Sequence, residues 1–329
     1  MEVDDSRSQR RTLPTSTSVR LRLKTAFWIS LALEVFSMTT GMLQGQVRGV
    51  YPLGMGAVNS GMTPEPGFTY SNLFLLYSRS DFRDPQGTVI ATGENSVLMD
   101  MNSFVYVTNK ELRFLGGALL SFSATLPIAN NSLSSDLNGP QSGGGGFADS
   151  YYQPLILGWR KKRANVRAIY GFLAPTGRFK AGASNNVGSG YWTHVGAAGE
   201  TFHLTEDGGI SASAFQMYEF HTTQEGTGIH PGETFNLDYS LMGSLHRTGD
   251  MSLQAGLVGY EQRQTSAKTG GPVTLAESQE RYAINALGFA VSAVFSGRKS
   301  TLGLKYFKEF ANRSTNQGYS LQITASIGF

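Results

Sequence analysis

Five charged side chains stand inside segments that otherwise alternate apolar and small polar residues. They are Asp100, Arg167, Glu219, Asp238 and Lys305. Carboxylates and cationic groups placed close together can exchange protons, form ion pairs or line a path for a solute. If these segments cross a membrane as strands, a charge that faces lipid costs about 2 to 4 kcal/mol near the bilayer centre, so we expect all five to point inward.

The sequence leaves two roles open for these inward charges. They could line a substrate path, or they could form a solvated network of internal ion pairs. Paired acids for glycoside hydrolysis cannot be told from such a network by sequence. We select Arg167, Glu219 and Asp238 as the polar residues most suited to contact a passing solute.

The histidines offer little for catalysis or metal binding. They are His194, His203, His221, His230 and His246. They fall in different expected strands and loops, and none belongs to a signature such as Gly-x-Ser-x-Gly or His-Glu-x-x-His. The chain has no cysteine, so thiolate nucleophiles, thiolate metal sites and disulfides are excluded. We therefore predict no catalytic residue, no metal and no cofactor, in a protein that is not an enzyme.

The elements that position the charges are expected to be strands. In the last ten residues, apolar side chains such as Leu321 and Ile323 alternate with polar ones such as Ser320 and Gln322, up to Phe329. Successive residues of a strand point to opposite faces, and an outer-membrane barrel turns its apolar face to lipid. A terminal aromatic suits the interfacial girdle, and we expect Phe329 to be recognised by the barrel-assembly machinery.

Twelve segments of this kind follow one another. They are Phe68 to Ser78, Val97 to Thr108, Phe114 to Ile128, Tyr151 to Arg160, Ala164 to Ala174, Gly190 to Leu204, Ile210 to His221, Thr234 to Arg247, Met251 to Gln264, Arg281 to Phe295, Ser300 to Phe310 and Gly318 to Phe329. Short connections such as 161–163 alternate with long ones such as 130–149. This order predicts an all-β fold, a twelve-stranded antiparallel up-and-down transmembrane β-barrel with both ends on the short-turn side.

Glycine and alanine locally blur the alternation. We expect the stretches 196–199 and 286–293 to mark bends of the wall or a side opening, because such residues allow bends and close approaches in strands. The run Gly143–Gly146 has neither a phosphate-loop signature nor a following helix pattern. We expect it to lie in a mobile outer loop.

Composition excludes other classes of protein. Only 16% of the residues are charged, and after the first 46 residues no run of eighteen apolar residues could form a spanning helix. The first 46 residues hold six of the 27 Lys and Arg and four of the 24 acids, which leaves the remainder nearly neutral. Because no basic stripe is present, we expect no nucleic-acid partner.

Residues 1–46 have the features of a secretory signal peptide. Basic Arg20, Arg22 and Lys24 precede a mainly apolar stretch, and small or polar residues follow near Gly45 and Gln46, where we expect cleavage. The alternative is an uncleaved N-terminal anchor helix.

Residues 47–67 are rich in glycine and proline and form neither a helix nor a spanning strand. We expect them to tuck into a barrel formed by residues 68–329 as a plug or hatch. Its contacts would be made by Tyr51, Met55, Val58 and Met62, since apolar side chains gain from burial. The alternative is a disordered periplasmic tail.

Several motifs give the chain a family resemblance. They are Tyr51-Pro52-Leu53-Gly54, Pro64-Glu65-Pro66-Gly67-Phe68, Ala174-Pro175-Thr176-Gly177-Arg178-Phe179, Asn186-Val187-Gly188-Ser189-Gly190-Tyr191-Trp192 and Ala286-Leu287-Gly288. Over about residues 50–329 the chain resembles the outer-membrane barrel family labelled for the meta-pathway of phenol degradation. The resemblance implies a channel for aromatic or other hydrophobic compounds, distantly similar to long-chain fatty-acid channels.

These observations predict a channel in the outer membrane of a Gram-negative type bacterium for passive uptake of small hydrophobic molecules, aromatic ones among them. Its partners would be these solutes and outer-membrane lipid, and we expect Phe179, Tyr191 and Trp192 to capture solutes at the outer loops. Two alternatives remain open. One is a lipid-modifying barrel enzyme, which needs a serine within reach of a histidine. The other is a structural or adhesive barrel with a filled lumen.

Overall fold

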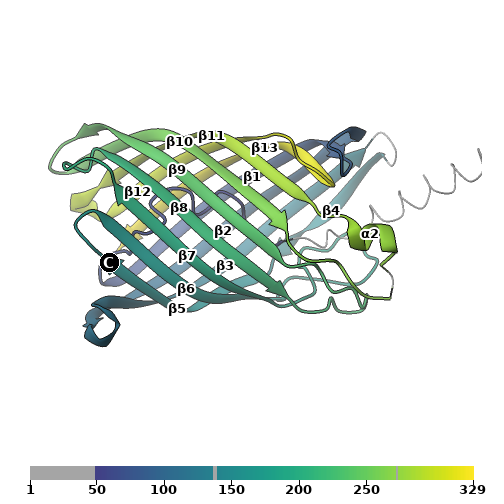
Figure 1. Cartoon of the computed structure of the whole chain (residues 1–329), viewed down its shortest axis with the longest axis horizontal. Helices are drawn as coiled ribbons and strands as arrows, with labels where there is room; N and C mark the ends of the chain where they lie inside the picture. Colours follow the sequence, from purple (N-terminus) through teal and green to yellow (C-terminus); the bar gives the residue numbers. More distant parts are fainter. Residues whose placement is uncertain (1–48, 136–138, 272) are drawn as a thin grey trace, which may run out of the picture. The chain divides into compact units, whose positions relative to one another are not determined.

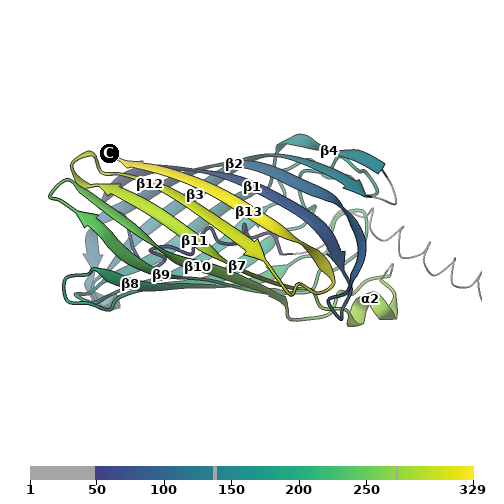
Figure 2. The ribbon, with the colours of Figure 1, turned by 90° about the horizontal axis from the view of Figure 1, so that it is seen from above.

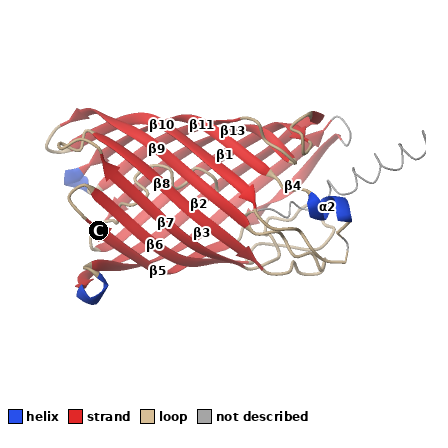
Figure 3. Ribbon diagram, viewed as in Figure 1, coloured by secondary structure: helices blue, strands red, loops and turns tan. Residues whose placement is uncertain are grey.

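A computed structural model describes residues 49–135, 139–271 and 273–329, which belong to one compact unit. The predicted signal peptide lies outside the described residues. What is described is almost entirely β-strand, with the 3-10 turns η1 (Arg113–Leu115) and η2 (Ser296–Arg298) and the short helix α2 (Leu275–Gln279) (Figure 3). Among the described residues, no helix is long and apolar enough to cross a lipid bilayer.

Thirteen strands are present in the described part. They are β1 (Gly67–Arg83), β2 (Val89–Leu112), β3 (Ala118–Ser135), β4 (Gly139–Phe147), β5 (Ser150–Arg160), β6 (Ala164–Ala174), β7 (Thr193–His203), β8 (Ile210–His221), β9 (Thr234–Arg247), β10 (Met251–Gln264), β11 (Ala283–Phe295), β12 (Ser300–Glu309) and β13 (Thr315–Gly328). All pair antiparallel, in the order β2-β1-β13-β12-β11-β10-β9-β8-β7-β6-β5-β3. A further pairing between β2 and β3 closes this order into a twelve-stranded barrel, as predicted (Figures 1 and 2).

Strand β4 is an addition that the sequence pattern did not reveal. It contains the run Gly143–Gly146, which was expected in a mobile loop, and it pairs with the outer half of β3 from Ile128 onward. The inner half of β3 pairs with β5 only as far as Thr125. Because β3 continues beyond β5, its backbone groups need another partner, and β4 supplies it.

The connections divide the barrel into two ends. Short turns, including η1 and η2, lie at the end that also holds the C-terminus, and the long connections with α2 lie at the other (Figure 1). We call these the inner and outer ends. The N–H of Phe329 donates to the carbonyl of Phe68 at 2.8 Å, which ties the last residue to the start of β1 at the inner end.

The wall alternates as the sequence predicted. In β9, Asn236 and Asp238 are fully buried inside the barrel, whereas Leu241 is 48% exposed on the outside. In β13, Gln322 is buried and Ile323 is 43% exposed. The exterior is therefore the apolar face that a bilayer requires, and the polar groups are enclosed.

One of the five strand charges does not follow the expectation. Arg167, Glu219, Asp238 and Lys305 point inward, but Asp100 pairs across the sheet with Phe74 and Ile128, both of which are exposed outside. Direct cross-strand partners share a face, so Asp100 is an outward residue. The Asn72 side-chain amide donates to its carboxylate, and this local hydrogen bond reduces the cost of its position.

The two stretches rich in glycine and alanine form no side opening. The stretches 196–199 and 286–293 pair continuously with both neighbouring strands. Register slips lie elsewhere: both ladders of β1 slip between Arg79 and Asp81, and both ladders of β5 slip around Pro154. Proline has no N–H to donate to a ladder, so it is tolerated in a strand at a bulge such as this one.

Candidate functional site

The interior of the barrel is occupied by the N-terminal segment, which we define as residues 49–66. Gly49 lies near Tyr282 at the outer end, where its N–H donates to the tyrosine oxygen at 2.8 Å. At the other extremity, Glu65 meets Arg160 at the inner end, at 3.1 Å. The segment therefore runs the length of the lumen before it enters β1 at Gly67 (Figure 1).

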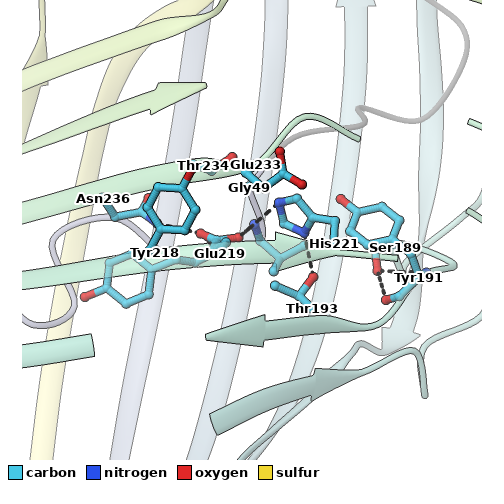
Figure 4. Close-up of polar contacts among 12 residues, drawn as sticks. Gly49, Ser189, Tyr191, Thr193, Tyr218, Glu219, His221, Glu233, Thr234 and Asn236 are labelled. Carbon is cyan, nitrogen blue, oxygen red and sulfur yellow. Dashed lines mark hydrogen bonds and ion pairs between the residues drawn. The ribbon is translucent and has the colours of Figure 1, made fainter. Parts of the chain in front are cut away.

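Glu219 of β8 holds the outer part of the segment. Its carboxylate accepts the N–H of Val50 at 2.8 Å and lies 3.4 Å from the N–H of Tyr51. The amide of Asn236 also donates to it, at 2.6 Å. Figure 4 shows Gly49, Glu219 and Asn236 in this cluster. A fully buried carboxylate requires such donors, and here two of them are backbone groups of the segment.

His221 extends this polar cluster toward the outer loops. Its Nε2 is 3.7 Å from Glu219 Oε2, and its Nδ1 is 2.8 Å from the hydroxyl of Thr193 (Figure 4). The ring of Tyr191 packs edge-on against the imidazole, with the ring centroids 5.2 Å apart. A hydroxyl, an imidazole and a carboxylate in a row resemble a nucleophile with its base, but all three side chains are buried inside the barrel, away from its lipid-facing surface.

Asp238 of β9 holds the middle of the segment at a tight turn. Its carboxylate accepts the hydroxyl of Tyr51 at 2.6 Å and the N–H groups of Gly54 and Gly56, both at 3.0 Å. On the other side of the turn, Lys305 Nζ donates to the carbonyls of Gly54 and Met55 at 2.7 and 3.0 Å. The carboxylate of Asp238 thus binds N–H groups of the turn, and the ammonium group of Lys305 binds carbonyl groups of the same turn.

Apolar packing surrounds this polar turn. Tyr51, Leu53 and Ala57 are buried among inward side chains of the wall in one continuous cluster, and Met55 and Val58 pack against it. The ring of Tyr51 stacks on Phe215 of β8 with centroids 5.6 Å apart. Met62 behaves differently from its prediction as a contact residue, since it is 43% exposed.

The inner part of the segment lies directly against the wall. Arg167 Nε donates to the carbonyl of Ser60 at 2.7 Å, and the hydroxyl of Thr201 accepts the N–H of Gly61 at 3.0 Å. A Cβ at Gly199 would come within 2.3 Å of the Ser60 carbonyl, so only glycine permits this approach. The glycines at 196–199, which were expected to bend the wall, include a residue that makes room for the segment.

The polar residues chosen from sequence are thus brought together on one ligand, the segment itself. Arg167, Glu219 and Asp238 bind it at its inner, outer and central parts. The sequence missed Tyr282 and Gln322, whose side chains bind Gly49 and Leu53. The alternating pattern predicts that both side chains point inward. Nothing else in the sequence distinguishes them from other inward polar residues.

The three aromatic residues chosen for solute capture do not lie together in the structure. Tyr191 is buried and faces inward, whereas its neighbour Trp192 is 45% exposed and packs outside against Phe172. Phe179 lies on the backbone of Gly190, where a Cβ would come within 2.3 Å of its ring. The structure therefore forms no common aromatic cluster from these three residues.

The outer loops are joined by Asp149. Its carboxylate accepts the N–H of Gly177 at 3.0 Å, and the N–H and hydroxyl of Ser189 at 2.7 and 2.6 Å. These donors stand in two of the sequence motifs, on either side of the loop 175–192. Desolvation by burial raises the pKa of the Asp149 carboxyl, and the three hydrogen bonds oppose that shift only in part.

The described residues contain no group of three or more His, Asp or Glu side chains that could hold a metal ion. None of their histidines is hydrogen-bonded to a serine hydroxyl. Their side-chain hydrogen bonds join His194 to Tyr170, His203 to Asn165, His221 to Thr193 and His230 to Glu233. The arrangement is suited to binding a peptide segment through its backbone and an apolar cluster through its side chains.

Comparison with known proteins agrees with this architecture. The model of the family described as "Putative MetA-pathway of phenol degradation" matches residues 79–325. An outer membrane channel from Pseudomonas putida F1 has a similar structure, with a TM-score of 0.64 and 14% identity over 85% of this chain and all of the other. No curated protein sequence matches this chain.

Two further solved structures are more distant. The β domain of the Bordetella autotransporter BrkA gives a TM-score of 0.48 at 13% identity, over 80% of this chain and all of the other. The monoaromatic hydrocarbon channel CymD gives 0.37 at 11% identity, over 84% of this chain and 94% of the other. At these scores they add nothing to the argument.

Proposed function

This chain belongs to the family whose model spans residues 79–325, and on that premise we propose that it is a channel for passive uptake of small hydrophobic molecules. Its location is the outer membrane of a Gram-negative bacterium, as the closed barrel with an apolar exterior requires. The Pseudomonas putida relative of similar fold is itself described as an outer membrane channel.

The observation that carries the proposal is the way the N-terminal segment is held. The segment continues into β1 at Gly67, and its other contacts with the wall are non-covalent. Its polar contacts concentrate at Glu219, Asp238, Lys305 and Arg167. Between these polar residues the inner face of the wall is apolar and includes Phe215. A segment bound in this way can move aside as a hatch, and a hydrophobic solute can replace its side chains on the apolar surface.

Solutes would reach this surface from the outer end. Tyr191 faces the lumen beside His221 and is our candidate for the first inward aromatic contact, with Phe179 in the loop above. At the bulge around Pro154 both ladders of β5 slip in register, so the regular pairing of the wall is interrupted there. This bulge offers a lateral route between lumen and bilayer that complements movement of the hatch.

The experiment that tests the proposal compares the mature protein with a variant that lacks residues 47–66. Both are purified in detergent, their barrels are verified by heat-modifiable migration, and single-channel conductance is recorded in planar bilayers. Uptake of toluene and of a hydrophilic sugar of similar size is measured in proteoliposomes. We expect deletion to create or enlarge conductance, and we expect the intact protein to favour toluene.

If neither protein conducts ions in the bilayer and neither solute is taken up, the result contradicts a channel and favours a structural barrel with a filled lumen. A lipid-modifying enzyme would instead release fatty acid from phospholipid, and substitution of His221 by Ala would abolish that release.

A further inference from the structure

The side chain of Tyr51 is a phenol, and every part of it is recognised inside the barrel. Its hydroxyl donates to Asp238 Oδ2 at 2.6 Å and accepts the N–H of Gly56 at 2.8 Å. Its ring stacks on Phe215, with 5.6 Å between centroids and 30° between planes. Donor, acceptor and aromatic face are therefore all matched, and the residue is 5% exposed.

The surroundings of this ring are built to be rigid. A Cβ at Gly56 would approach the ring of Phe215 to 2.9 Å and the hydroxyl of Tyr51 to 2.9 Å, so the turn passes as close to both as a backbone can. Lys305 fixes the same turn through the carbonyls of Gly54 and Met55. The acceptor Asp238 is itself completely buried on β9. Such preorganisation lowers the entropic cost of binding a small ring.

We propose that Phe215, Asp238 and the Gly56 N–H form a binding site for a small aromatic molecule with one hydroxyl group, and that Tyr51 occupies this site as an internal ligand. A phenol that enters the lumen replaces the Tyr51 side chain, while the turn at Gly54 and Gly56 stays bound to Asp238 and Lys305. The inference rests on the proposed function, which it deepens by naming a class of solute.

The site discriminates by the hydroxyl. Asp238 Oδ2 receives the Tyr51 hydroxyl and the Gly56 N–H, and an aromatic hydrocarbon leaves this buried carboxylate short of one donor. Unpaired buried polar groups disfavour binding strongly, so we expect a phenol to bind at least tenfold tighter than the hydrocarbon of the same shape. A methyl ether keeps the oxygen but cannot donate, and it should behave like the hydrocarbon.

Tyr51 competes from within the same chain. A tethered ligand acts at an effective concentration on the order of millimolar, so a free phenol binds the wild-type protein more weakly than a protein without the tyrosine ring. This competition lets solute concentration govern the release of the Tyr51 side chain from Asp238.

The test uses the mature protein in detergent and the variant Tyr51→Ala, with 4-methylphenol, toluene and 4-methylanisole as probes. Affinities are measured by isothermal titration calorimetry. We expect Tyr51→Ala to bind 4-methylphenol at least tenfold tighter than wild type does, and at least tenfold tighter than it binds either of the other probes. Adding Asp238→Asn should remove this preference. The outward-facing Tyr239→Ala is the matched control and should bind as wild type does.

Truncation of a buried ring can prevent folding, so Tyr51→Phe provides a second measurement. It keeps the stacked ring and removes the hydroxyl, which should accelerate hydrogen exchange of the Gly56 amide and strengthen 4-methylphenol binding relative to wild type. Equal binding of all three probes by Tyr51→Ala, or an unchanged Gly56 amide in Tyr51→Phe, would overturn the site. Absence of solute uptake by the wild-type protein would instead count against the channel and would leave these binding results standing.

Discussion

Glu219 Oε2 accepts a hydrogen bond of 2.8 Å from the backbone N–H of Val50, although 169 residues separate the two in the chain. The contact joins the first described part of the N-terminal segment to β8 near the outer end of the barrel. Because the donor is a backbone group, the residue type at position 50 does not predict this hydrogen bond. Its energetic value lies in the carboxylate, which is fully buried and depends on this donor, on Tyr51 and on Asn236.

Replacing Glu219 by Gln should loosen the outer part of the segment. Gln places an N–H₂ group where one carboxylate oxygen accepts hydrogen bonds, and the loss of a charged hydrogen bond costs about 1.5 to 3 kcal/mol. We expect at least a tenfold rise in the open fraction of single-channel recordings. The control is Glu65→Gln, which removes an exposed ion pair with Arg160 worth about 0 to 1 kcal/mol. Equal effects of the two variants would contradict this anchoring role.

Gly54→Ala should disrupt the central turn. Gly54 has a φ of +81°, and a Cβ there would approach the ring of Phe307 to 2.6 Å. Left-handed backbone costs a non-glycine residue about 1 to 2 kcal/mol, and overpacking adds about 1 to 3 kcal/mol. We expect faster hydrogen exchange of Gly56 and a larger open fraction, while the wall strands keep their protection.

A matched control for that variant is Gly249→Ala in a short turn at the inner end. A Cβ at Gly249 would meet no atom within 4 Å, so this change should alter neither the exchange of the segment nor the conductance. An unchanged turn in Gly54→Ala would show that the segment is not held there in the way the contacts indicate.

Tyr191 and Trp192 should have different phenotypes. Tyr191 is inward against His221, and its replacement by Ala should lower the rate of hydrophobic solute uptake several-fold. Trp192 lies outside against Phe172, so Trp192→Ala should reduce the thermal stability of the barrel by removing an aromatic contact of about 0.5 to 1.5 kcal/mol. Uptake in proteoliposomes and loss of heat-modifiable migration separate the two effects. A loss of uptake in Trp192→Ala alone would reverse the assignment.

The outer loops should be less tightly closed at higher pH. Burial raises the folded-state pKa of Asp149 above the ordinary value near 3.9, so between these values the folded protein binds more protons than the unfolded protein. Under that condition stability falls as pH rises. Hydrogen exchange of residues 175–189, corrected for intrinsic rates, should show protection decreasing across this interval.

Asp149→Asn supplies the control, because an amide does not titrate. Its loops should be less protected than wild type, since one Asn oxygen cannot serve the donors of both Gly177 and Ser189, and their protection should not vary across the same interval. Protection that increases with pH in the wild type would contradict the assignment.

Periodicity alone determined the barrel. In β9 and β13 the alternation around Asp238 and Gln322 predicts which side chains face lipid, because successive residues of a strand point to opposite faces. The sheet must also close, because a bilayer leaves no partner for the backbone groups of an open edge. The alternation of short and long connections gave the end at which the chain terminates. Several strand boundaries, among them those of β6, β8, β9 and β10, were predicted to the residue.

Periodicity failed where pairing partners rather than side-chain pattern decide the structure. β4 has no alternating pattern, and it is a strand because β3 extends beyond β5 and leaves backbone groups to be satisfied. Asp100 was expected inside, but its cross-strand register with Phe74 and Ile128 turns it outward. A shift of one residue reverses the face of a side chain, and single-residue parity is uncertain in a long strand such as β2.

The sequence determined that inward charges exist and that a glycine- and proline-rich segment precedes the first strand, and only the tertiary structure decided that each binds the other. Glu219, Asp238 and Lys305 stand on three different strands, and the groups they bind between Val50 and Gly56 are mostly backbone N–H and C=O. Backbone groups are nearly the same at every position, so the residue types of the segment do not predict such contacts. They arise when closure of the barrel brings distant strands around one segment and leaves it as the partner for their buried charges.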